Sequence, residues 1–232
     1  MTPFAEALLD ATRPLIMEVK RRDAHGGDLL GDRPLAEVVA AYEAAQAPCL
    51  SVVTGKWFGG TPEMLREVAS LTDKPVLQKD FITRRDQVET ARRLGASAVL
   101  LTAGLLPRAG LAMLIDAAAS AGLTPFVEVT TEAEIDGLPL AEECVIAVNN
   151  KDIRTGERDA GDLGRSSRLL PAVRRNGAGC AVSASGIDRP EVAARLLREG
   201  YDGLLIGTSL LRAGRLGRWV EEFDTAIHAC YV

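Results

Sequence analysis

The sequence predicts an α/β protein that forms a single (β/α)8 barrel, a TIM barrel, over residues 1–232. Short apolar runs recur along the chain with starts about 20 to 36 residues apart, and each is followed by a segment with helical periodicity. Most of these runs are apolar throughout, as expected for parallel strands that are buried on both faces. No Pro/Gly/Ser-rich linker separates two halves, and 232 residues suffice for one barrel.

Eight predicted strands follow one another in the order that the barrel requires. They are Leu15 to Val19, Cys49 to Val53, Pro75 to Leu77, Ser97 to Leu101, Pro125 to Val129, Cys144 to Val148, Cys180 to Ser183 and Gly203 to Ile206. Between them, apolar residues three and four apart predict one-sided helices, as at Leu35, Val38, Val39 and Tyr42. Gly95, Gly122 and Gly200 stand where these helices need a left-handed C-terminal residue.

The composition excludes several classes of protein. Hydrophobic residues make up 47% and charged residues 25% of the chain, which is typical of a globular protein with a sizeable core. The net charge of −5 carries no basic block, so a nucleic acid is not expected as a partner. No apolar run is long enough for a membrane span and Met1 to Asp10 lacks a basic leader, which predicts a cytoplasmic protein that binds no membrane.

Cysteine and histidine do not indicate a metal or a disulfide. Cys49, Cys144, Cys180 and Cys230 are widely separated, and three of them begin apolar runs, where a thiol behaves as a small hydrophobic group. His25 and His228 have no spacing typical of metal ligands. We therefore expect no metal site.

The carboxyl ends of the strands are unusually charged, and this is where such barrels build their active sites. Strand one leads into Glu18 and Lys20, strand three into Lys79, and Glu128 lies in strand five. These groups could form a salt-bridge network in which Glu18 neutralises Lys20 and Glu128 neutralises Lys79. A ring of acids and lysines is also what general acid–base catalysis needs, and we favour that interpretation.

The last two strands predict a phosphate site. Ser185 and Gly186 follow strand seven, and Gly207 and Thr208 follow strand eight, which are the positions where these barrels bind phosphate with backbone N–H groups. A phosphorylated small molecule is the expected partner. If Gly207 serves only this contact, replacing it by valine should raise KM more than it lowers kcat.

At these motifs the chain resembles the indole-3-glycerol phosphate synthase family, from about Pro14 to Phe223. Glu18-Val19-Lys20-Arg21 resembles the family's E-[IV]-K-R, and Pro75-Val76-Leu77-Gln78-Lys79-Asp80-Phe81-Ile82 its P-V-L-x-K-D-F-I. Between these two motifs, Cys49-Leu50-Ser51-Val52 and Phe58-Gly59-Gly60 resemble the family's C-L-S-V and F-x-G segments. Val127-Glu128-Val129, Asn149-Asn150 and Ser185-Gly186-Ile187 follow in order.

The resemblance implies a reaction and a role for each residue. The family closes 1-(2-carboxyphenylamino)-1-deoxyribulose 5-phosphate to indole-3-glycerol phosphate, a carbon–carbon lyase reaction that releases carbon dioxide and water without a cofactor. Lys79 would be the general acid at the ketone, with Glu128 as its carboxylate partner. Glu18 and Lys20 would help in proton transfer and dehydration, Lys20 also reaching the phosphate, while Asn149 would orient hydroxyl groups and Phe58 and Phe81 would enclose the aromatic ring.

Four positions depart from the family pattern. Asp23 and His25 replace parts of S-P-S, Lys151 replaces an arginine that follows the asparagines, and Ala184 replaces the glutamate of S-E-S-G. Asp23 could supply the carboxylate that Ala184 lacks. These departures keep two alternatives open: a paralogous barrel enzyme acting on another phosphorylated amino-sugar or aryl-amine, and a catalytically weak binding subunit. A monomer and a homodimer are both compatible with the sequence.

Overall fold

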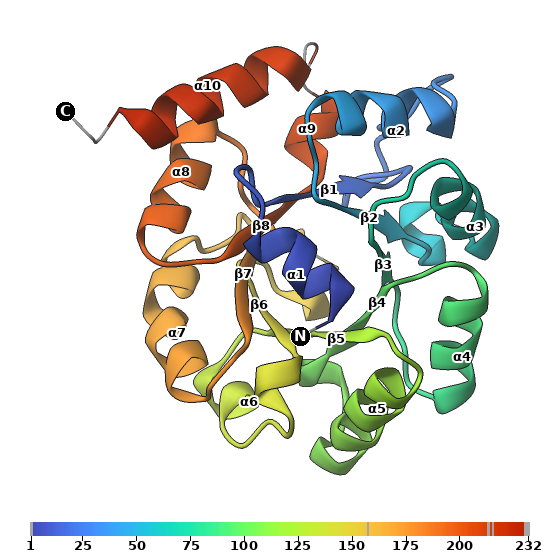
Figure 1. Ribbon diagram of the computed structural model, residues 1–232, viewed down its shortest axis with the longest axis vertical. Coiled ribbons are helices and arrows are strands. Elements are labelled where there is room, and N and C mark those ends of the chain that lie inside the picture. The colour runs from blue at the N-terminus through green and yellow to red at the C-terminus, as the bar shows by residue number, and fades with distance from the viewer. Residues whose placement is uncertain (1, 157, 213, 215, 230–232) are drawn as a thin grey trace.

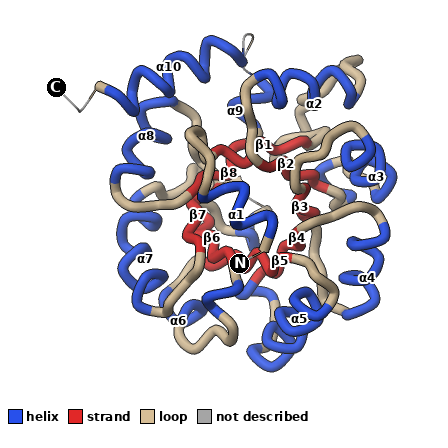
Figure 2. Tube along the Cα trace, viewed as in Figure 1, coloured by secondary structure: helices blue, strands red, loops and turns tan. Residues whose placement is uncertain are grey.

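A computed structural model describes residues 2–156, 158–212, 214 and 216–229. Eight parallel strands form a closed barrel in chain order, with β8 pairing to β1, which confirms the predicted fold class. Figure 2 shows the ring of strands inside an outer ring of helices. The strands are β1 (Leu15–Val19), β2 (Cys49–Val53), β3 (Val76–Lys79), β4 (Ala98–Thr102), β5 (Thr124–Val129), β6 (Val145–Asn149), β7 (Cys180–Ala184) and β8 (Gly203–Ile206).

Four strands extend further toward their carboxyl ends than the apolar runs predicted, namely β3, β4, β6 and β7. The backbone ladder continues through polar residues, because Lys79 pairs with Val53 and Asn149 pairs with Ala184. Each of these predicted strands ended at the last residue of its apolar run. In the structure, the hydrogen-bonded ladder continues for one or two residues beyond that point, up to the candidate site. Lys79 and Asn149 are therefore held by the sheet itself.

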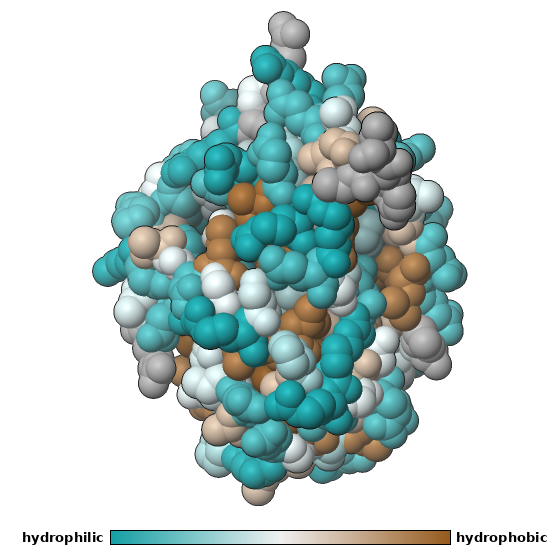
Figure 3. Space-filling view, turned by 90° about the vertical axis from the view of Figure 1, so that its left-hand side faces the viewer, coloured by the Kyte–Doolittle hydropathy of each residue, from teal (hydrophilic) through white to brown (hydrophobic). Residues whose placement is uncertain are grey.

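Helices alternate with the strands and cover the outside of the barrel (Figure 1). Figure 3 shows the side that bears α7 and α8: hydrophilic residues cover most of it, with hydrophobic residues in smaller patches between them. The helices are α1 (Pro3–Leu9), α2 (Leu35–Ala44), α3 (Pro62–Ser70), α4 (Arg85–Arg93), α5 (Arg108–Ser120), α6 (Glu132–Ile135), α7 (Gly164–Arg175), α8 (Pro190–Arg198), α9 (Thr208–Arg212) and α10 (Leu216–His228).

Alternating strand residues face two separate cores. Met17, Leu50 and Val99 belong to the larger cluster, which the helices cover on the outside of the sheet. Ile16, Leu77 and their counterparts fill the barrel interior; these are Cys49, Ala98, Leu100, Phe126, Val145, Ala147, Cys180, Val182, Ala184 and Leu205. Both faces of every strand are thus buried, as the continuous apolar runs predicted.

Helix α1 lies across the opening at the amino-terminal ends of the strands (Figure 1). Phe4 and Leu8 of α1 join the interior cluster, and the Phe4 ring meets Phe126 edge-on at 6.2 Å between centroids. Gly203 makes room for this helix, because a Cβ there would lie 2.6 Å from a methyl carbon of Leu8. Cavities that open between the strands therefore lie at the opposite, carboxyl end.

Cys49, Cys144 and Cys180 are buried free thiols, and Cys230 lies outside the described residues. Burial raises the pKa of Cys49 and of Cys144 to about 12, which leaves both thiols protonated at neutral pH. Within the described ranges, no group of three or more His, Cys, Asp or Glu could hold a metal ion. None of the described helices combines the length and apolar character of a membrane span.

Candidate active site

Three odd-numbered strands present a charged, inward-facing residue at the carboxyl mouth of the barrel. Glu18 of β1, Lys79 of β3 and Glu128 of β5 line one cavity, and they come from alternate strands, as the layers of such barrels do. The corresponding residue of β7 is Ala184, which is fully buried in the interior cluster. The fourth position of this layer therefore carries a methyl group instead of a charge.

Glu18 is a buried anion between two lysines. Its Oε1 lies 3.0 Å from Lys20 Nζ and its Oε2 lies 3.3 Å from Lys79 Nζ. Burial raises the pKa of Glu18, but the charges and hydrogen bonds of Lys20 and Lys79 outweigh it and bring the pKa down to about 2. Glu18 is consequently ionised at neutral pH. The expected salt-bridge pair of Glu18 and Lys20 is present, and Lys79 joins it.

This ionised state predicts a loss of stability in acid. Because the pKa of Glu18 is lower in the folded chain than its ordinary value of 4.5, its stabilisation is complete above about pH 5 and disappears as the pH falls toward about 2. The loss should amount to about 3 kcal/mol. Denaturant unfolding at several pH values measures it.

A matched pair of variants isolates the contribution of Glu18. Glu18→Gln should be less stable at neutral pH, because Lys20 and Lys79 lose a buried counter-ion, but its stability should vary less with pH. Glu222→Gln removes an acid from an exposed ion pair with Arg218 and should keep the full acid dependence. An equal acid dependence in Glu18→Gln and the unmodified protein would refute the assignment.

An aromatic cavity opens beside the three charged residues. Trp57 and Phe58, which follow β2, and Phe81, which follows β3, line it together with Leu100 and Ile153. Trp57 packs against Phe81 with ring centroids 4.8 Å apart, and Lys20 Nζ lies 5.8 Å from the centre of the Phe58 ring. The walls of this cavity therefore have the chemistry that suits a flat, apolar group, and they lie close to acids and lysines.

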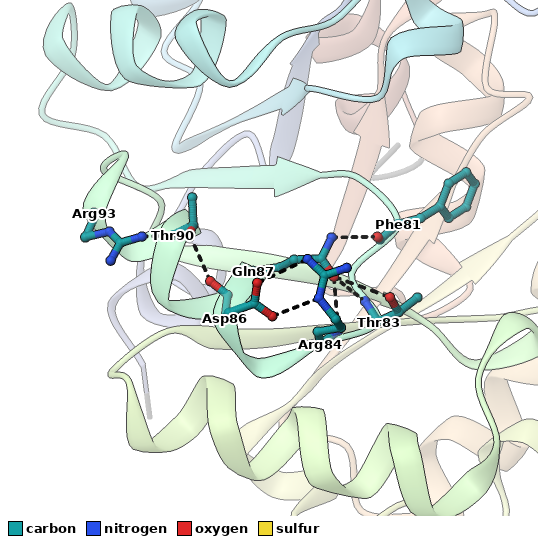
Figure 4. A network of polar contacts seen from close by, with 7 residues as sticks. All are labelled: Phe81, Thr83, Arg84, Asp86, Gln87, Thr90 and Arg93. Atoms are coloured by element: carbon teal, nitrogen blue, oxygen red, sulfur yellow. Dashed lines mark hydrogen bonds and ion pairs between the residues drawn. The ribbon is translucent and has the colours of Figure 1, made fainter.

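Polar side chains hold the backbone of Phe81 on both sides. The N–H of Phe81 donates to Asp80 Oδ1 at 2.8 Å, and its carbonyl oxygen accepts from Gln87 Nε2 at 3.3 Å. Figure 4 shows Gln87 reaching back from α4 to this loop while the Phe81 ring points away from the network. Asp80 also accepts from the Thr54 hydroxyl at 2.7 Å, which ties the loops after β2 and β3 together.

A second cavity, with a volume of about 410 Å³, shares Glu18, Lys20 and Lys79 with the aromatic one. It extends toward β7 and β8, and its other walls are mainly polar. They include Asp23, His25, Lys151, Ser185, Gly186, Asp188, Gly207, Thr208, Ser209 and Arg212. Lysines, an arginine, hydroxyl groups and glycine N–H groups are what a phosphate site needs.

Asn150 holds the turn after β7. Ser185 and Gly186 both have left-handed backbones, with φ of 65° and 73°, and this conformation is costly for a serine. The buried Nδ2 of Asn150 lies 3.0 Å from the carbonyl oxygen of Ala184 and 3.1 Å from that of Ser185. Its Oδ1 accepts from the Ser166 hydroxyl at 2.8 Å, so the turn is anchored to α7.

Gly207 has a role that the sequence did not indicate. A Cβ at this position would lie 2.4 Å from Oε1 and 3.1 Å from Cβ of Glu18. The absence of a side chain therefore leaves room for the buried carboxylate, in addition to any contact of the Gly207 backbone with a ligand.

The structure brings most of the expected site residues together. Glu18, Lys20, Lys79, Glu128, Phe58 and Phe81 surround the aromatic cavity, and Asp23, His25, Lys151, Ser185, Gly186, Gly207 and Thr208 line the second one. Asn149 and Ala184 are not among the lining residues of either cavity and are fully buried. The buried Nδ2 of Asn149 has no hydrogen-bond partner among the described residues, and the expected contact of Asn149 with ligand hydroxyl groups stays a prediction.

Trp57 and Arg212 line the cavities although the sequence did not single them out. Trp57 directly precedes Phe58, so its neighbourhood could have indicated it. Arg212 lies in α9, and only the closure of β8 on β1 brings it to the loop that holds Asp23. The carboxylate of Asp23 contacts Arg212, whereas Ala184 faces the interior core.

Comparison with known proteins agrees with these motifs. A sequence model of the indole-3-glycerol phosphate synthase family matches residues 1–223. Indole-3-glycerol phosphate synthase 2 of Ralstonia nicotianae is 36% identical over 229 residues, which cover 97% of this chain and 83% of that protein. Indole-3-glycerol phosphate synthase of Pyrococcus furiosus is 37% identical over 214 residues, 92% of each chain.

Among solved structures, 3-hexulose-6-phosphate synthase from Salmonella typhimurium superposes with a TM-score of 0.71 over 93% of this chain and 98% of that one. Its sequence identity is 16%, so the likeness concerns the fold alone. The family match extends over nearly the whole chain and includes the motifs that line both cavities. The chain therefore belongs to the indole-3-glycerol phosphate synthase family.

Proposed function

We propose that this protein is an indole-3-glycerol phosphate synthase. It closes 1-(2-carboxyphenylamino)-1-deoxyribulose 5-phosphate to indole-3-glycerol phosphate and releases carbon dioxide and water. The family match and the names of the relatives support the reaction. The arrangement of the two cavities supports the way in which this chain performs it.

The observation that carries the proposal is that an aromatic and a polar cavity meet at one charged cluster. Glu18, Lys20 and Lys79 line both cavities. The substrate has an aromatic ring at one end, a phosphate at the other, and a ketone between them. Placing the ring beside Phe58 and Phe81 and the phosphate beside Thr208 puts the ketone next to the lysines and carboxylates.

The lysines and carboxylates of this charged cluster supply the proton transfers that the reaction needs. The ring carbon that bears the carboxylate attacks the ketone carbon, and Lys79 donates a proton to the ketone oxygen as that carbon–oxygen π bond breaks. The carboxylate leaves as carbon dioxide, and its bonding electrons restore the aromatic ring. The new hydroxyl then leaves as water with a proton from an acid, while a base removes a proton from the adjacent carbon. Glu18, Lys20 and Glu128 are the groups at hand for this dehydration.

The test is to incubate the purified protein with the carboxyphenylamino substrate and to follow indole fluorescence and absorbance. Formation of the indole, with release of one equivalent of carbon dioxide, is the expected result. A folded protein that forms no indole at any substrate concentration would contradict the proposal. Chemical analysis of the phosphorylated product distinguishes ring closure from simple decarboxylation.

Ala184 favours a second candidate, a paralogous enzyme for a related phosphorylated amino-sugar or aryl-amine. The methyl group of Ala184 occupies the fourth position of the layer that Glu18, Lys79 and Glu128 form, where the family pattern has a carboxylate. A substrate with fewer hydroxyl groups to bind would tolerate this loss. Comparing kcat/KM for the carboxyphenylamino substrate with that for its analogues separates the two candidates, and binding without turnover of any of them would indicate a binding subunit.

The location and the assembly state are also part of the proposal. We place the protein in the cytoplasm as a monomer or homodimer that binds neither nucleic acid nor membranes. The acidic net charge of −5 argues against a nucleic acid as a partner. Sedimentation of the purified protein determines whether it is a monomer or a dimer.

A further inference from the structure

The carboxylate of Asp23 organises the loop that follows β1. Its Oδ1 accepts the backbone N–H of His25 at 2.8 Å and that of Gly27 at 2.9 Å. Two backbone hydrogen bonds of 3.0 Å close the same turn, from the N–H of Asp23 to the Gly27 carbonyl and from the N–H of Gly26 to the Asp23 carbonyl. A Cβ at Gly27 would lie 2.8 Å from Oδ2, so a side chain there would push the Asp23 carboxylate out of its present position.

The other oxygen of Asp23 contacts a residue from the far end of the chain. Oδ2 forms a charge-assisted hydrogen bond with Nη2 of Arg212, which lies in α9 after the last strand. Both residues line the second cavity. The side chain of Asp23 is 7% exposed and that of Arg212 is 60% exposed, so a buried acid holds a base that remains open to the cavity and solvent.

Asp23 is ionised in this arrangement. Burial raises its pKa, but the N–H groups of Gly27 and His25 and the charge of Arg212 outweigh burial and hold the pKa below its ordinary value. The negative charge of Asp23 is thus already balanced inside the protein. It does not face a ligand as an unpaired repulsive charge.

We propose that Asp23 is a positioning residue that holds the Arg212 guanidinium at the wall of the second cavity, where Arg212 binds the substrate's phosphate. This inference rests on the proposed function for the identity of the substrate. A guanidinium carries five N–H donors, so the bond to Asp23 leaves donors for phosphate oxygens. The family pattern that this chain resembles has a serine at position 23, and the acid–arginine pair is a feature of this chain.

The proposal predicts the opposite sign from a simple charge effect. If Asp23 were only a negative charge near the phosphate, removing that charge would tighten phosphate binding. If Asp23 positions Arg212, removing the charge releases the guanidinium and weakens binding, even though the cavity becomes more positive. Whether KM rises or falls when the charge of Asp23 is removed therefore distinguishes a positioning role from a simple charge effect.

Asp23→Asn is the decisive variant. Asparagine keeps a side-chain oxygen for the N–H groups of His25 and Gly27 and loses the charge that pairs with Arg212. We expect KM for the phosphorylated substrate to rise about three- to tenfold while kcat changes less than about twofold. The partial exposure of Arg212 limits the effect to this range.

Asp28→Asn is the matched control. Asp28 lies in the same loop, and its Oδ1 accepts the N–H groups of Leu30 and Gly31, both at 3.0 Å. It is exposed and is not among the residues that line the second cavity. This variant removes an equal charge from the loop without touching Arg212, so we expect KM to stay unchanged or to fall slightly.

Inorganic phosphate provides a readout that needs no turnover. Phosphate should raise the Tm of the unmodified protein at constant ionic strength, and Asp23→Asn and Arg212→Gln should both lose most of this rise. Combining the two substitutions should add little to either one, because both remove the same contact. An unchanged or lower KM in Asp23→Asn, or retained protection by phosphate, would overturn the proposal. If the protein forms no indole but Asp23→Asn loses phosphate protection, the proposed function fails and the positioning role stands.

Discussion

Replacing Lys79 by methionine is expected to lower kcat for indole formation by about a hundredfold or more. Methionine preserves much of the volume of the lysine stem but cannot donate a proton to the ketone. The barrel should still fold, because Lys20 remains 3.0 Å from Glu18 and keeps a counter-ion beside it. Steady-state kinetics with the carboxyphenylamino substrate, together with thermal melts, measure both effects.

Lys79→Arg distinguishes a proton donor from a mere counter-ion. Arginine restores the positive charge beside Glu18, but its pKa is too high for it to release a proton readily. If Lys79 acts as the general acid, Lys79→Arg should recover the Tm of the unmodified protein while kcat stays low. If Lys79→Arg recovers both Tm and kcat, Lys79 acts only as a counter-ion in the salt-bridge network.

The order of strands and helices could be predicted because hydropathy alone distinguishes the two elements here. The runs from Leu15 to Val19, from Cys49 to Val53 and from Gly203 to Ile206 match the strands of the structure. Elsewhere the polar residues at the carboxyl ends interrupted the apolar runs, although the ladder carries Lys79 and Asn149 as strand residues. Hydropathy reports burial in an apolar core, whereas Lys79 lines the two cavities and Asn149 is a buried polar residue at the end of its strand.

The convergence of the charged strand ends could be predicted from the fold class, whereas the long-range partners of loop residues could not. Lys79 and Glu128 follow from the fold class, since charged residues at these strand ends have to converge at the barrel mouth. The partner of Asp23 depends on where α9 begins after β8 and on how the loop after β1 folds back. These features involve residues separated by 189 positions, and no local pattern encodes them.

Gly207 shows how a steric fact changes an expected result. From the sequence, Gly207→Val should chiefly raise KM by blocking backbone contacts with the phosphate. In the structure, the new Cβ would lie 2.4 Å from Oε1 of Glu18, and this carboxylate is held by Lys20 and Lys79. We therefore expect Gly207→Val to displace Glu18 and to lower kcat by about a hundredfold, in addition to any rise in KM.

Two comparisons test whether the displacement of Glu18 causes the expected fall in kcat of Gly207→Val. Thr208→Val removes a hydroxyl from the same cavity and keeps the shape of the side chain, so it should raise KM and leave kcat nearly unchanged. If Gly207→Val behaves in the same way, position 207 contributes to binding alone.

Glu18→Asp shortens the side chain by one methylene and so makes room for the methyl group that Gly207→Ala adds. If the two side chains compete for one space, the double variant should lose less activity than the sum of the single losses predicts. We expect a coupling above about 0.5 kcal/mol, because substitutions that share a contact or a space are not additive.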